Sequence, residues 1–191
     1  MDKNDLPYDT PDLITNAINF ATKKHFGQLR KGTTIPYITH PIDVMHILQN
    51  EGCSEIVAAA GVLHDVLEDT DATPEEIQKI FGVDILKLII AESEDKSKTW
   101  KERKQATIYS LDNATLDIKM ICFADKLSNL RSMANDLTSV GEKLWERFNA
   151  SKDEIEWYYG SVFSKMIDLS HTKMYKEYIQ LLEKVFGKRA I

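Results

Sequence analysis

The stretch Gly61-Val-Leu-His-Asp-Val-Leu-Glu-Asp-Thr70 places an imidazole and three carboxylates in an otherwise apolar segment. The residues that precede His64 are apolar on nearly every helical face, which is typical of a helix at the centre of a fold. In one continuous helix, His64 lies above Glu68 and Asp65 lies above Asp69, in adjacent columns. Such a set of charges is costly to bury unless a cation compensates it, and a divalent metal is the simplest compensation.

A second polar interruption lies in residues 120–131, where Asp125 breaks a helix that is apolar on both sides. Asp125, Ser128, Asn129 and Ser132 follow the i, i+3, i+4, i+7 spacing and therefore share one helix face. A hydrogen-bonded aspartate in the core is the alternative interpretation. A metal site needs ligands from several elements, however, so Asp125 and the pair at 64–65 support each other.

His40 stands at the start of a further expected helix and completes a set of two histidines and two aspartates with His64, Asp65 and Asp125. Mixed imidazole and carboxylate ligands suit Mn, Fe, Zn or Mg and leave positions for water and a phosphate oxygen. No thiolate cluster accompanies them, which excludes a structural zinc finger. The alternatives are a surface or capping role for His40 and a solvated acidic helix end at residues 69–71.

Length and composition indicate a soluble all-α protein. The 191 residues are 43% hydrophobic and 28% charged, which favours a single globular domain over residues 1–191, with its core between about 10 and 190. Only 8 glycines and 5 prolines punctuate the chain, so we expect a bundle of about 8–10 helices. Helices are expected near 13–21, 40–50, 55–67, 74–93 (split at 81–82), 105–110, 116–133, 152–159 and 175–186, with a loop over 25–38 that holds a short extended pair. Their expected caps are Thr10, Thr39, Ser54, Thr73 and Ser151.

The net charge of −6 comes from 24 basic and 30 acidic residues and argues against general nucleic-acid binding. A small anionic ligand remains compatible with a local patch of Lys23, Lys24, Arg30 and Lys31. The two cysteines lie in apolar segments, which fits a reducing compartment. No secretory signal and no membrane-spanning stretch is evident, so the expected location is the cytoplasm.

Four ordered motifs resemble one enzyme family. They are residues 25–31 (His-Phe-Gly-Gln-Leu-Arg-Lys), 36–41 (Pro-Tyr-Ile-Thr-His-Pro), 63–70 (Leu-His-Asp-Val-Leu-Glu-Asp-Thr) and 124–131 (Ala-Asp-Lys-Leu-Ser-Asn-Leu-Arg). The His…His-Asp…Asp pattern is that of the HD-domain metal-dependent phosphohydrolases, and the flanking residues resemble the hydrolase domain of RelA/SpoT-type enzymes. The length resembles that of stand-alone small alarmone hydrolases, including the metazoan SpoT homologues.

The resemblance implies an all-α HD fold that hydrolyses the 3′-pyrophosphate of ppGpp or pppGpp to GDP or GTP and pyrophosphate, usually with Mn²⁺. The matching positions for metal ligands are His40, His64, Asp65 and Asp125. Glu68 and Asp69 match the pair that activates or positions the attacking water. Arg30 and Lys31 match the pair that contacts base and phosphates, and Asn129 and Ser132 match positions near the ribose.

Two departures from the long RelA/SpoT-type proteins stand out. The loop Gly32-Thr-Thr-Ile-Pro36 borders the expected base position, which leaves guanine over adenine undecided. Lys126 replaces an arginine, as in the stand-alone enzymes. Other phosphate esters stay open as substrates, namely (p)ppApp, a nucleoside monophosphate or the 2′-phosphate of NADPH, and so does a sensor that binds nucleotide without turnover.

The remaining polar and aromatic features are interpreted as structural. His25 and His46 are expected to be structural, and Cys122 is expected in the core. The basic stretch 96–104 is interpreted as a solvated loop rather than a phosphate contact. The aromatic residues between 145 and 163 are expected to pack the C-terminal helices, with Lys152 or Tyr158 as further residues that could reach the site.

Overall fold

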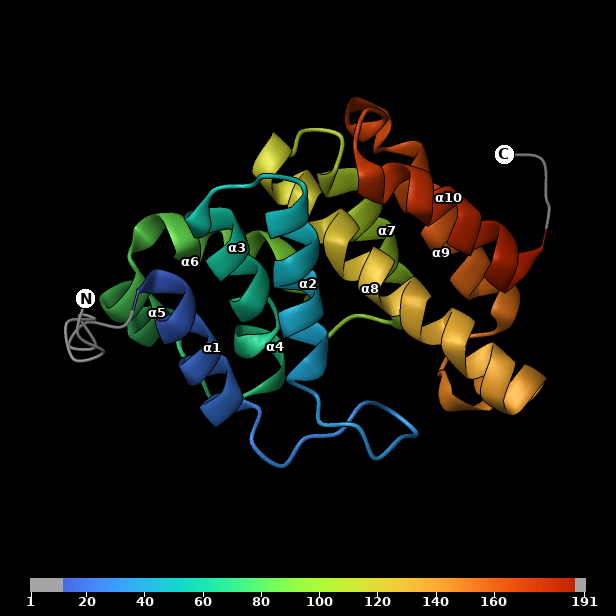
Figure 1. The fold of residues 1–191 in the computed structure, drawn as a ribbon, viewed down its shortest axis with the longest axis horizontal. Helices are drawn as coiled ribbons and strands as arrows, with labels where there is room; N and C mark the ends of the chain where they lie inside the picture. Colours follow the sequence, from blue (N-terminus) through green and yellow to red (C-terminus); the bar gives the residue numbers. More distant parts are fainter. Residues whose placement is uncertain (1–11, 188–191) are drawn as a thin grey trace, which may run out of the picture.

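The structure is a computed structural model that describes residues 12–187 (Figure 1). Its helices are α1 (Leu13–Lys24), α2 (Thr39–Asn50), α3 (Glu55–Leu63), α4 (Val66–Asp69), α5 (Pro74–Phe81), α6 (Val83–Glu92), α7 (Trp100–Ser110), α8 (Leu116–Val140), α9 (Lys152–Ser164) and α10 (Lys173–Phe186). Two 3-10 helices, η1 (Gly141–Arg147) and η2 (Ile167–Leu169), join them. Within residues 12–187 the only β feature is an isolated bridge between Leu29 and Pro36. The expected all-α fold is confirmed, and the bridge is the short extended pair expected in the loop.

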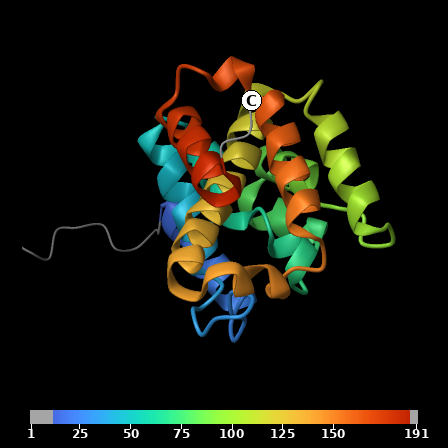
Figure 2. The same ribbon diagram turned by 90° about the vertical axis from the view of Figure 1, so that its right-hand side faces the viewer.

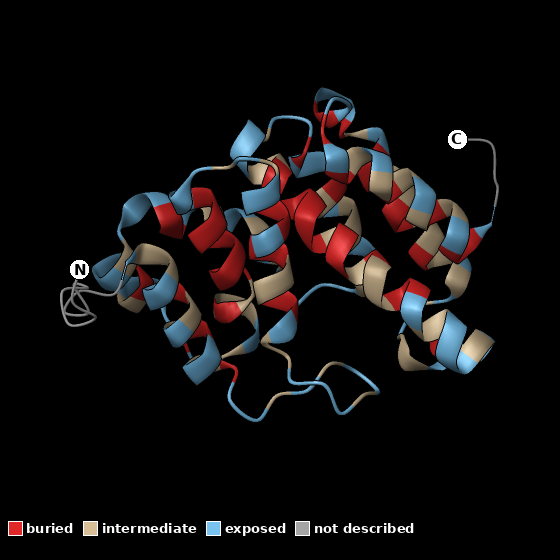
Figure 3. Cartoon of the chain, in the orientation of Figure 1, coloured by how far each residue is buried: buried red, intermediate tan, exposed pale blue. Residues whose placement is uncertain are grey.

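Helices α2, α3 and α8 form the centre of the molecule. α3 packs against α1, α2, α6 and α8, and α8 also packs against α2 and α10. Seven of the nine α3 residues are buried, from Val57 to Leu63, and Figure 3 shows the buried positions gathered along the facing sides of α2, α3 and α8. Gly61 allows this packing, because a Cβ there would collide with the side chain of Leu48 on α2.

α8 spans the molecule and separates two groups of helices. Figure 1 shows α1–α6 on one side of it and α9 and α10 on the other, and the turned view of Figure 2 shows α10 lying against it. α8 extends to Val140, seven residues beyond the end expected at Met133, and η1 follows it. The helical pattern weakens after Met133 because positions 135–140 are mostly polar and exposed. In this part, Leu137 still packs against the core and Asp136 pairs with Arg147 of η1.

Several expected helix starts need correction. α1 is capped by Asp12, whose carboxylate accepts the Thr15 backbone N–H at 2.7 Å, whereas the expected cap Thr10 lies outside the described residues. Thr39 is the first helical residue of α2 instead of its cap, and its hydroxyl donates to the Pro36 carbonyl. The expected caps Ser54, Thr73 and Ser151 are confirmed.

The segment of residues 54–69 is two helices, not one. α3 ends at Leu63 and α4 begins at Val66, so the expected helix through 67 is interrupted at His64 and Asp65. The interruption coincides with a side-chain bond from His64 Nδ1 to the Gly61 carbonyl at 2.7 Å. The continuous register that placed His64 above Glu68 is therefore wrong.

Other features of the fold agree with the sequence. Cys122 is buried, and neither cysteine is in a disulfide. Within residues 12–187, no helix combines the length and the apolar character that crossing a bilayer requires. That the whole chain of residues 1–191 forms one domain stays a prediction.

Candidate metal centre

His64 lies at the end of α3 with one ring nitrogen fixed. Its Nδ1 donates to the Gly61 carbonyl at 2.7 Å, so Nε2 carries the lone pair in the neutral ring. The side chain is buried, and Nε2 has no hydrogen-bond partner among the described residues. Such a buried and unpaired nitrogen needs a cation or a donor opposite it.

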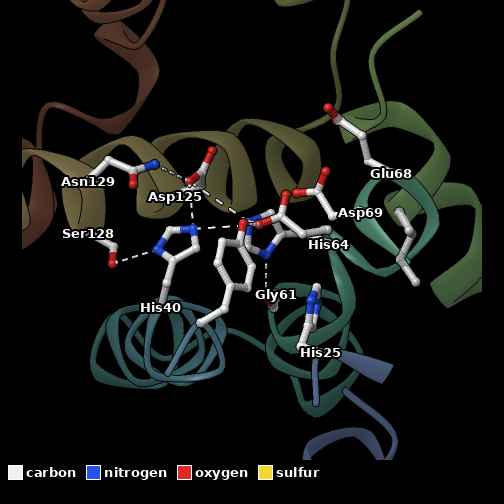
Figure 4. Close-up of polar contacts among 12 residues, drawn as sticks. His25, His40, Gly61, His64, Glu68, Asp69, Asp125, Ser128 and Asn129 are labelled. Atoms are coloured by element: carbon white, nitrogen blue, oxygen red, sulfur yellow. Dashed lines mark hydrogen bonds and ion pairs between the residues drawn. The ribbon is translucent and has the colours of Figure 1, made fainter. Parts of the chain in front are cut away.

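His40 presents its Nε2 to the same point from the first turn of α2. Its Nδ1 contacts the Ser128 hydroxyl of α8 at 3.0 Å, and its Nε2 lies 3.1 Å from Asp125 Oδ1. In Figure 4, the imidazoles of His40 and His64 and the carboxylate of Asp125 point towards a common centre. Ser128 belongs to the polar α8 face expected from the sequence, and its role is to orient the His40 ring.

The two carboxylates complete the cluster. Asp65 Oδ2 lies 3.0 Å from His64 Nε2 and 3.7 Å from His40 Nε2. Asp125 Oδ1 lies 3.8 Å from His64 Nε2. One ligand atom each from His40, His64 and Asp65 lies within 4.8 Å of the others, which is a spacing suited to a metal ion. The structure therefore brings all four predicted ligands together.

The donor set fits a divalent metal. Each imidazole turns its Nε2 towards carboxylate oxygens, and such a nitrogen faces an anion favourably only when it carries a proton or when a cation lies between them. Nitrogen and carboxylate ligands of this kind are those that Mn, Fe and Zn accept. The Nδ1 contacts with Gly61 and Ser128 are the outer contacts that orient histidine ligands in metal sites.

Without a metal, protons take its place. Burial lowers the pKa of His64, but the charges of Asp65 and Asp125 outweigh burial and raise it to about 9. Burial dominates at His40 and lowers its pKa, although Asp125 opposes the effect. Burial acts to raise the pKa of Asp65, but His64 and His40 together hold that pKa below its usual range. The cluster thus retains at least one positive charge opposite its carboxylates.

Asp125 is held from both sides along α8. The Lys126 ammonium is bonded to its Oδ2, and the Asn129 amide donates to its Oδ1 at 2.6 Å. Burial acts against the charge of Lys126, but the Asp125 carboxylate keeps the pKa of this lysine well above its usual value. Asp125 therefore stays ionised and fixed in orientation.

Glu68 and Asp69 lie on α4 in different surroundings. The Glu68 carboxylate lines the same cavity as the predicted metal ligands, which we call the metal-side cavity. It accepts the Glu94 backbone N–H at 3.4 Å and lies to one side of the imidazoles in Figure 4. Burial, together with the charges of Glu94 and Asp65, raises the pKa of Glu68. The Asp69 carboxylate is exposed and bonded to Lys96 at 2.8 Å, and Asp69 does not line that cavity.

Two adjoining cavities open from the cluster. The metal-side cavity, of about 280 Å³, contains the predicted ligands and Glu68. The loop-side cavity, of about 500 Å³, lies between residues 30–39, α8 and η1. Both are lined by Arg30, Tyr37, His40, Asn129 and Phe148, so the two cavities adjoin along these side chains.

All four residues predicted to bind substrate line the loop-side cavity, and Arg30 and Asn129 line both cavities. The Arg30 guanidinium donates to Asn129 Oδ1 at 2.7 Å, and Lys31 Nζ lies 3.3 Å from Asn149 Oδ1. Ser132 lies on the α8 face expected from the sequence. Lys23 and Lys24 line neither cavity, and Lys24 pairs with Asp71 and Glu76.

Sequence reasoning missed Arg147 of η1, which lines the loop-side cavity and pairs with Asp136 at 2.8 Å. A Cβ at Gly32, where φ is +71°, would lie 2.6 Å from Arg147 Cδ, so the loop rests directly on this arginine. The signal in the sequence is faint, because η1 has no helical pattern. Only its positive charge close to the apolar residues Leu144, Trp145 and Phe148 distinguishes it.

Sequence reasoning also missed Glu92, the last residue of α6, which lines the metal-side cavity. Burial raises its pKa to about 7 against the opposing effect of Lys126. Its only signal in the sequence is a charge that directly follows the apolar residues 88–91.

The basic stretch 96–104 divides between the two interpretations. Residues 100–104 belong to α7, and Lys104 lines the metal-side cavity while pairing with Glu94 at 2.6 Å. Lys96 pairs with Asp69, and Lys98 is exposed. Tyr158 also lines the cavity, whereas Lys152 pairs with Glu142 away from it.

His25 and the aromatic residues pack within the fold as expected, whereas a structural role for His46 stays a prediction. His25 is buried against the Tyr37 ring and bonded to Gln28, and His46 is exposed on α2. Trp145, Tyr159 and Phe163 pack with rings of α10, which confirms their role in packing the C-terminal helices.

Comparison with known proteins settles the family. A family model described as HD domain matches residues 17–156 and so includes all four predicted ligands. The chain belongs to the HD-domain family. Its solved relatives share the architecture: the structure of a metazoan ortholog of SpoT, described as hydrolysing ppGpp, superposes with a TM-score of 0.77 at 28% identity, covering 94% of this chain and 98% of that one.

Two curated HD-domain relatives are named guanosine-3′,5′-bis(diphosphate) 3′-pyrophosphohydrolases. The Drosophila melanogaster protein is 41% identical over 119 residues, which cover 61% of this chain and 66% of that protein. The Homo sapiens protein is 39% identical over 149 residues, which cover 75% of this chain and 79% of that protein.

Proposed function

We propose that this HD domain hydrolyses the 3′-pyrophosphate of ppGpp and pppGpp, releasing pyrophosphate and GDP or GTP, with Mn²⁺ as its metal. The observation that carries the proposal is the convergence of two Nε2 atoms and two carboxylates at the junction of two cavities. The names of the curated relatives support the substrate.

His40, His64, Asp65 and Asp125 are the proposed metal ligands. A bound divalent ion supplies Lewis acidity, which polarises a phosphoryl oxygen and makes water more acidic. The rest of the centre holds these ligands still: Ser128 and the Gly61 carbonyl fix the rings, and Lys126 and Asn129 fix Asp125. Ligands held in this way lose little freedom when the ion binds.

Glu68 is the proposed general base. Its raised pKa makes the carboxylate a better proton acceptor, and its contact with the Glu94 N–H orients it beside the cavity. Asp69 is proposed to help position the attacking water, as the family resemblance implies. Its bond to Lys96 also anchors the segment that follows α6 against α4.

The loop-side cavity is the proposed seat of the nucleoside. Arg30 and Lys31 would contact base and phosphates, and Asn129 and Ser132 the ribose. The charged lining of this cavity favours an anion: four cations, Arg30, Lys31, Arg131 and Arg147, face two carboxylates, Asp43 and Asp136. A planar guanidinium group can donate two parallel hydrogen bonds to the oxygens of one phosphate, which suits a multiply phosphorylated ligand.

The test is a panel of nucleotides incubated with Mn²⁺-loaded protein, with each product identified by mass. The proposal expects ppGpp and pppGpp to be consumed at the highest kcat/KM and to yield GDP and GTP. Faster turnover of ppApp, NADPH or a nucleoside monophosphate would reassign the substrate. Tight ppGpp binding without any product would indicate a sensor and contradict the enzymatic function.

A further inference from the structure

Tyr37 contacts the metal centre through its hydroxyl group. The hydroxyl donates to Asp65 Oδ2 at 2.5 Å, which is the same oxygen that lies 3.0 Å from His64 Nε2 and 3.7 Å from His40 Nε2. Neither histidine can hold that oxygen when its Nε2 is unprotonated. Tyr37 is therefore the neutral donor that sets the rotation of the Asp65 carboxylate.

Two neighbouring rings hold the Tyr37 phenol in place. The ring packs between the His25 ring, with centroids 4.8 Å apart, and the His40 ring, with centroids 6.0 Å apart in a T-shaped arrangement. A side chain packed on two sides points its hydroxyl in one direction only.

The same ring carries Arg30. The Arg30 guanidinium carbon lies 5.7 Å from the Tyr37 ring centroid, within the range of a cation–π contact. Arg30 also donates to Asn129, whose amide donates to Asp125 Oδ1. Side-chain contacts therefore link Arg30 to two of the proposed metal ligands. Tyr37 connects it to Asp65, and Asn129 connects it to Asp125.

We propose that Tyr37 is a positioning residue that orients Asp65 towards the metal through its hydroxyl and seats Arg30 for the substrate through its ring. The inference rests on the proposed function, because it takes Asp65 as a ligand. The two parts of the Tyr37 side chain then have separate roles. The hydroxyl oxygen orients the metal ligand Asp65, and the ring supports Arg30, which contacts the nucleotide.

Two substitutions separate these parts. Tyr37→Phe removes the hydroxyl and keeps the ring, so Mn²⁺ affinity and kcat should fall about 10- to 100-fold, the usual effect of losing an outer contact to a ligand. KM for ppGpp at saturating Mn²⁺ should change less than about twofold. Tyr37→Leu removes the ring as well and should raise KM in addition to the loss of Mn²⁺ affinity. Mn²⁺ binding is measured without substrate, from the electron paramagnetic resonance signal of the free ion.

Tyr178→Phe is the matched control, because it also removes one buried hydroxyl bond, from Tyr178 to the Tyr159 carbonyl at 3.1 Å. It should lower Tm and leave Mn²⁺ affinity and kcat unchanged. Equal Mn²⁺ affinity in Tyr37→Phe and the unsubstituted chain would overturn the inference alone. Failure of the unsubstituted chain to bind Mn²⁺ would overturn the proposed function and the inference together.

Discussion

The metal centre and the loop of residues 25–38 lie side by side but are built in opposite ways. Each residue at the centre is held by a second contact: His64 by Gly61, His40 by Ser128, and Asp125 by Lys126. His40, His64 and Asp125 are buried, and they stand on or directly after helices of the core.

The loop exposes most of its side chains and packs little against the core. Phe26 is 88% exposed and Ile35 is 51% exposed, which is unusual for large apolar residues and shows how little of the loop is covered. Single contacts hold the loop to the rest of the molecule: Gln28 to the Asp69 carbonyl, Arg30 to Asn129, Lys31 to Asn149, Tyr37 to Asp65 and Gly32 against Arg147, while the bridge of Leu29 to Pro36 holds it to itself. Segments with few buried contacts open most easily.

The contrast indicates that the metal centre and the loop have different functions. A rigid centre fixes the chemistry, so substitutions there should remove metal, turnover and stability together. An exposed loop adapts to its ligand, so substitutions of loop residues that line the loop-side cavity, such as Arg30, should change affinity for the nucleotide and leave the fold intact. Tyr37 is the exception, because its hydroxyl contacts Asp65 of the centre. Substitutions in the two regions test this difference, and a substitution at the metal centre should have the greatest consequence.

Asp125→Ala should have the largest effect, because it removes a proposed ligand and leaves Lys126 buried without its counter-ion. Turnover and Mn²⁺ binding should be lost, and unfolding should cost about 3–5 kcal/mol less. Denaturant titration and metal analysis measure both effects. Asp168→Ala is the control, because it removes the exposed partner of Lys119, a lysine on the same helix as Asp125. It should lower the free energy of unfolding by less than about 1 kcal/mol. Equal stability losses in the two variants would show that burial does not distinguish the centre.

Glu68→Gln should separate chemistry from metal binding. Turnover should fall about 10²-fold or more, because the amide cannot accept a proton, whereas Mn²⁺ content should stay unchanged. Asp69→Asn, on the exposed side of α4, should lose less activity. Single-turnover rates and elemental analysis provide the comparison. Normal turnover by Glu68→Gln would remove Glu68 from the mechanism.

Arg30→Ala tests the loop. KM for ppGpp should rise about 10-fold or more, because a charged hydrogen bond to phosphate is lost, while Tm should hardly change. Lys23→Ala removes a cation that is exposed and lines neither cavity, so it should leave KM unchanged. A large fall in Tm with an unaltered KM would show that Arg30 serves the fold instead of the substrate.

The smallest effect concerns Glu92, whose pKa is raised to about 7 in the folded chain from an ordinary value of 4.5. The folded state therefore favours the protonated carboxyl. Its contribution to the stability of metal-free protein is full below about pH 4.5 and is lost as the pH rises through about 7. Glu92→Gln should flatten this decline between pH 5 and 8, whereas exposed Glu146→Gln should not. Parallel stability curves for the unsubstituted chain and Glu92→Gln would contradict the assignment.

The sequence predicted the rigid part of the molecule better than the adaptable part. His40, His64, Asp65 and Asp125 interrupt apolar helices, and a charge in such a position needs a partner wherever the chain folds. The register after His64 was mispredicted, because a local bond of the His64 ring to Gly61 accompanies a break that helix periodicity does not encode. Thr39 was mispredicted as a cap for a related reason: its hydroxyl bonds backward to Pro36.

Residues that reach the site from distant segments were harder to predict. Arg147 lies on a 3-10 helix without an apolar stripe, and Glu92 stands at a helix end where an acidic residue is usually solvated. The positions of both depend on how α6 and η1 pack against α8. Tertiary packing of this kind is absent from local patterns. Tyr37 belongs to a quoted motif, but only the folded structure reveals its bond to Asp65.

We propose above all that the four-residue centre holds a divalent metal that the reaction requires. The most direct measurement removes metal with a chelator, reloads the protein with Mn²⁺ and follows ppGpp by ³¹P nuclear magnetic resonance. The account predicts no turnover by the chelated protein and, after Mn²⁺ is restored, formation of GDP and intact pyrophosphate in equal amounts. Full turnover by protein shown to contain no metal, or release of orthophosphate in place of pyrophosphate, would contradict it.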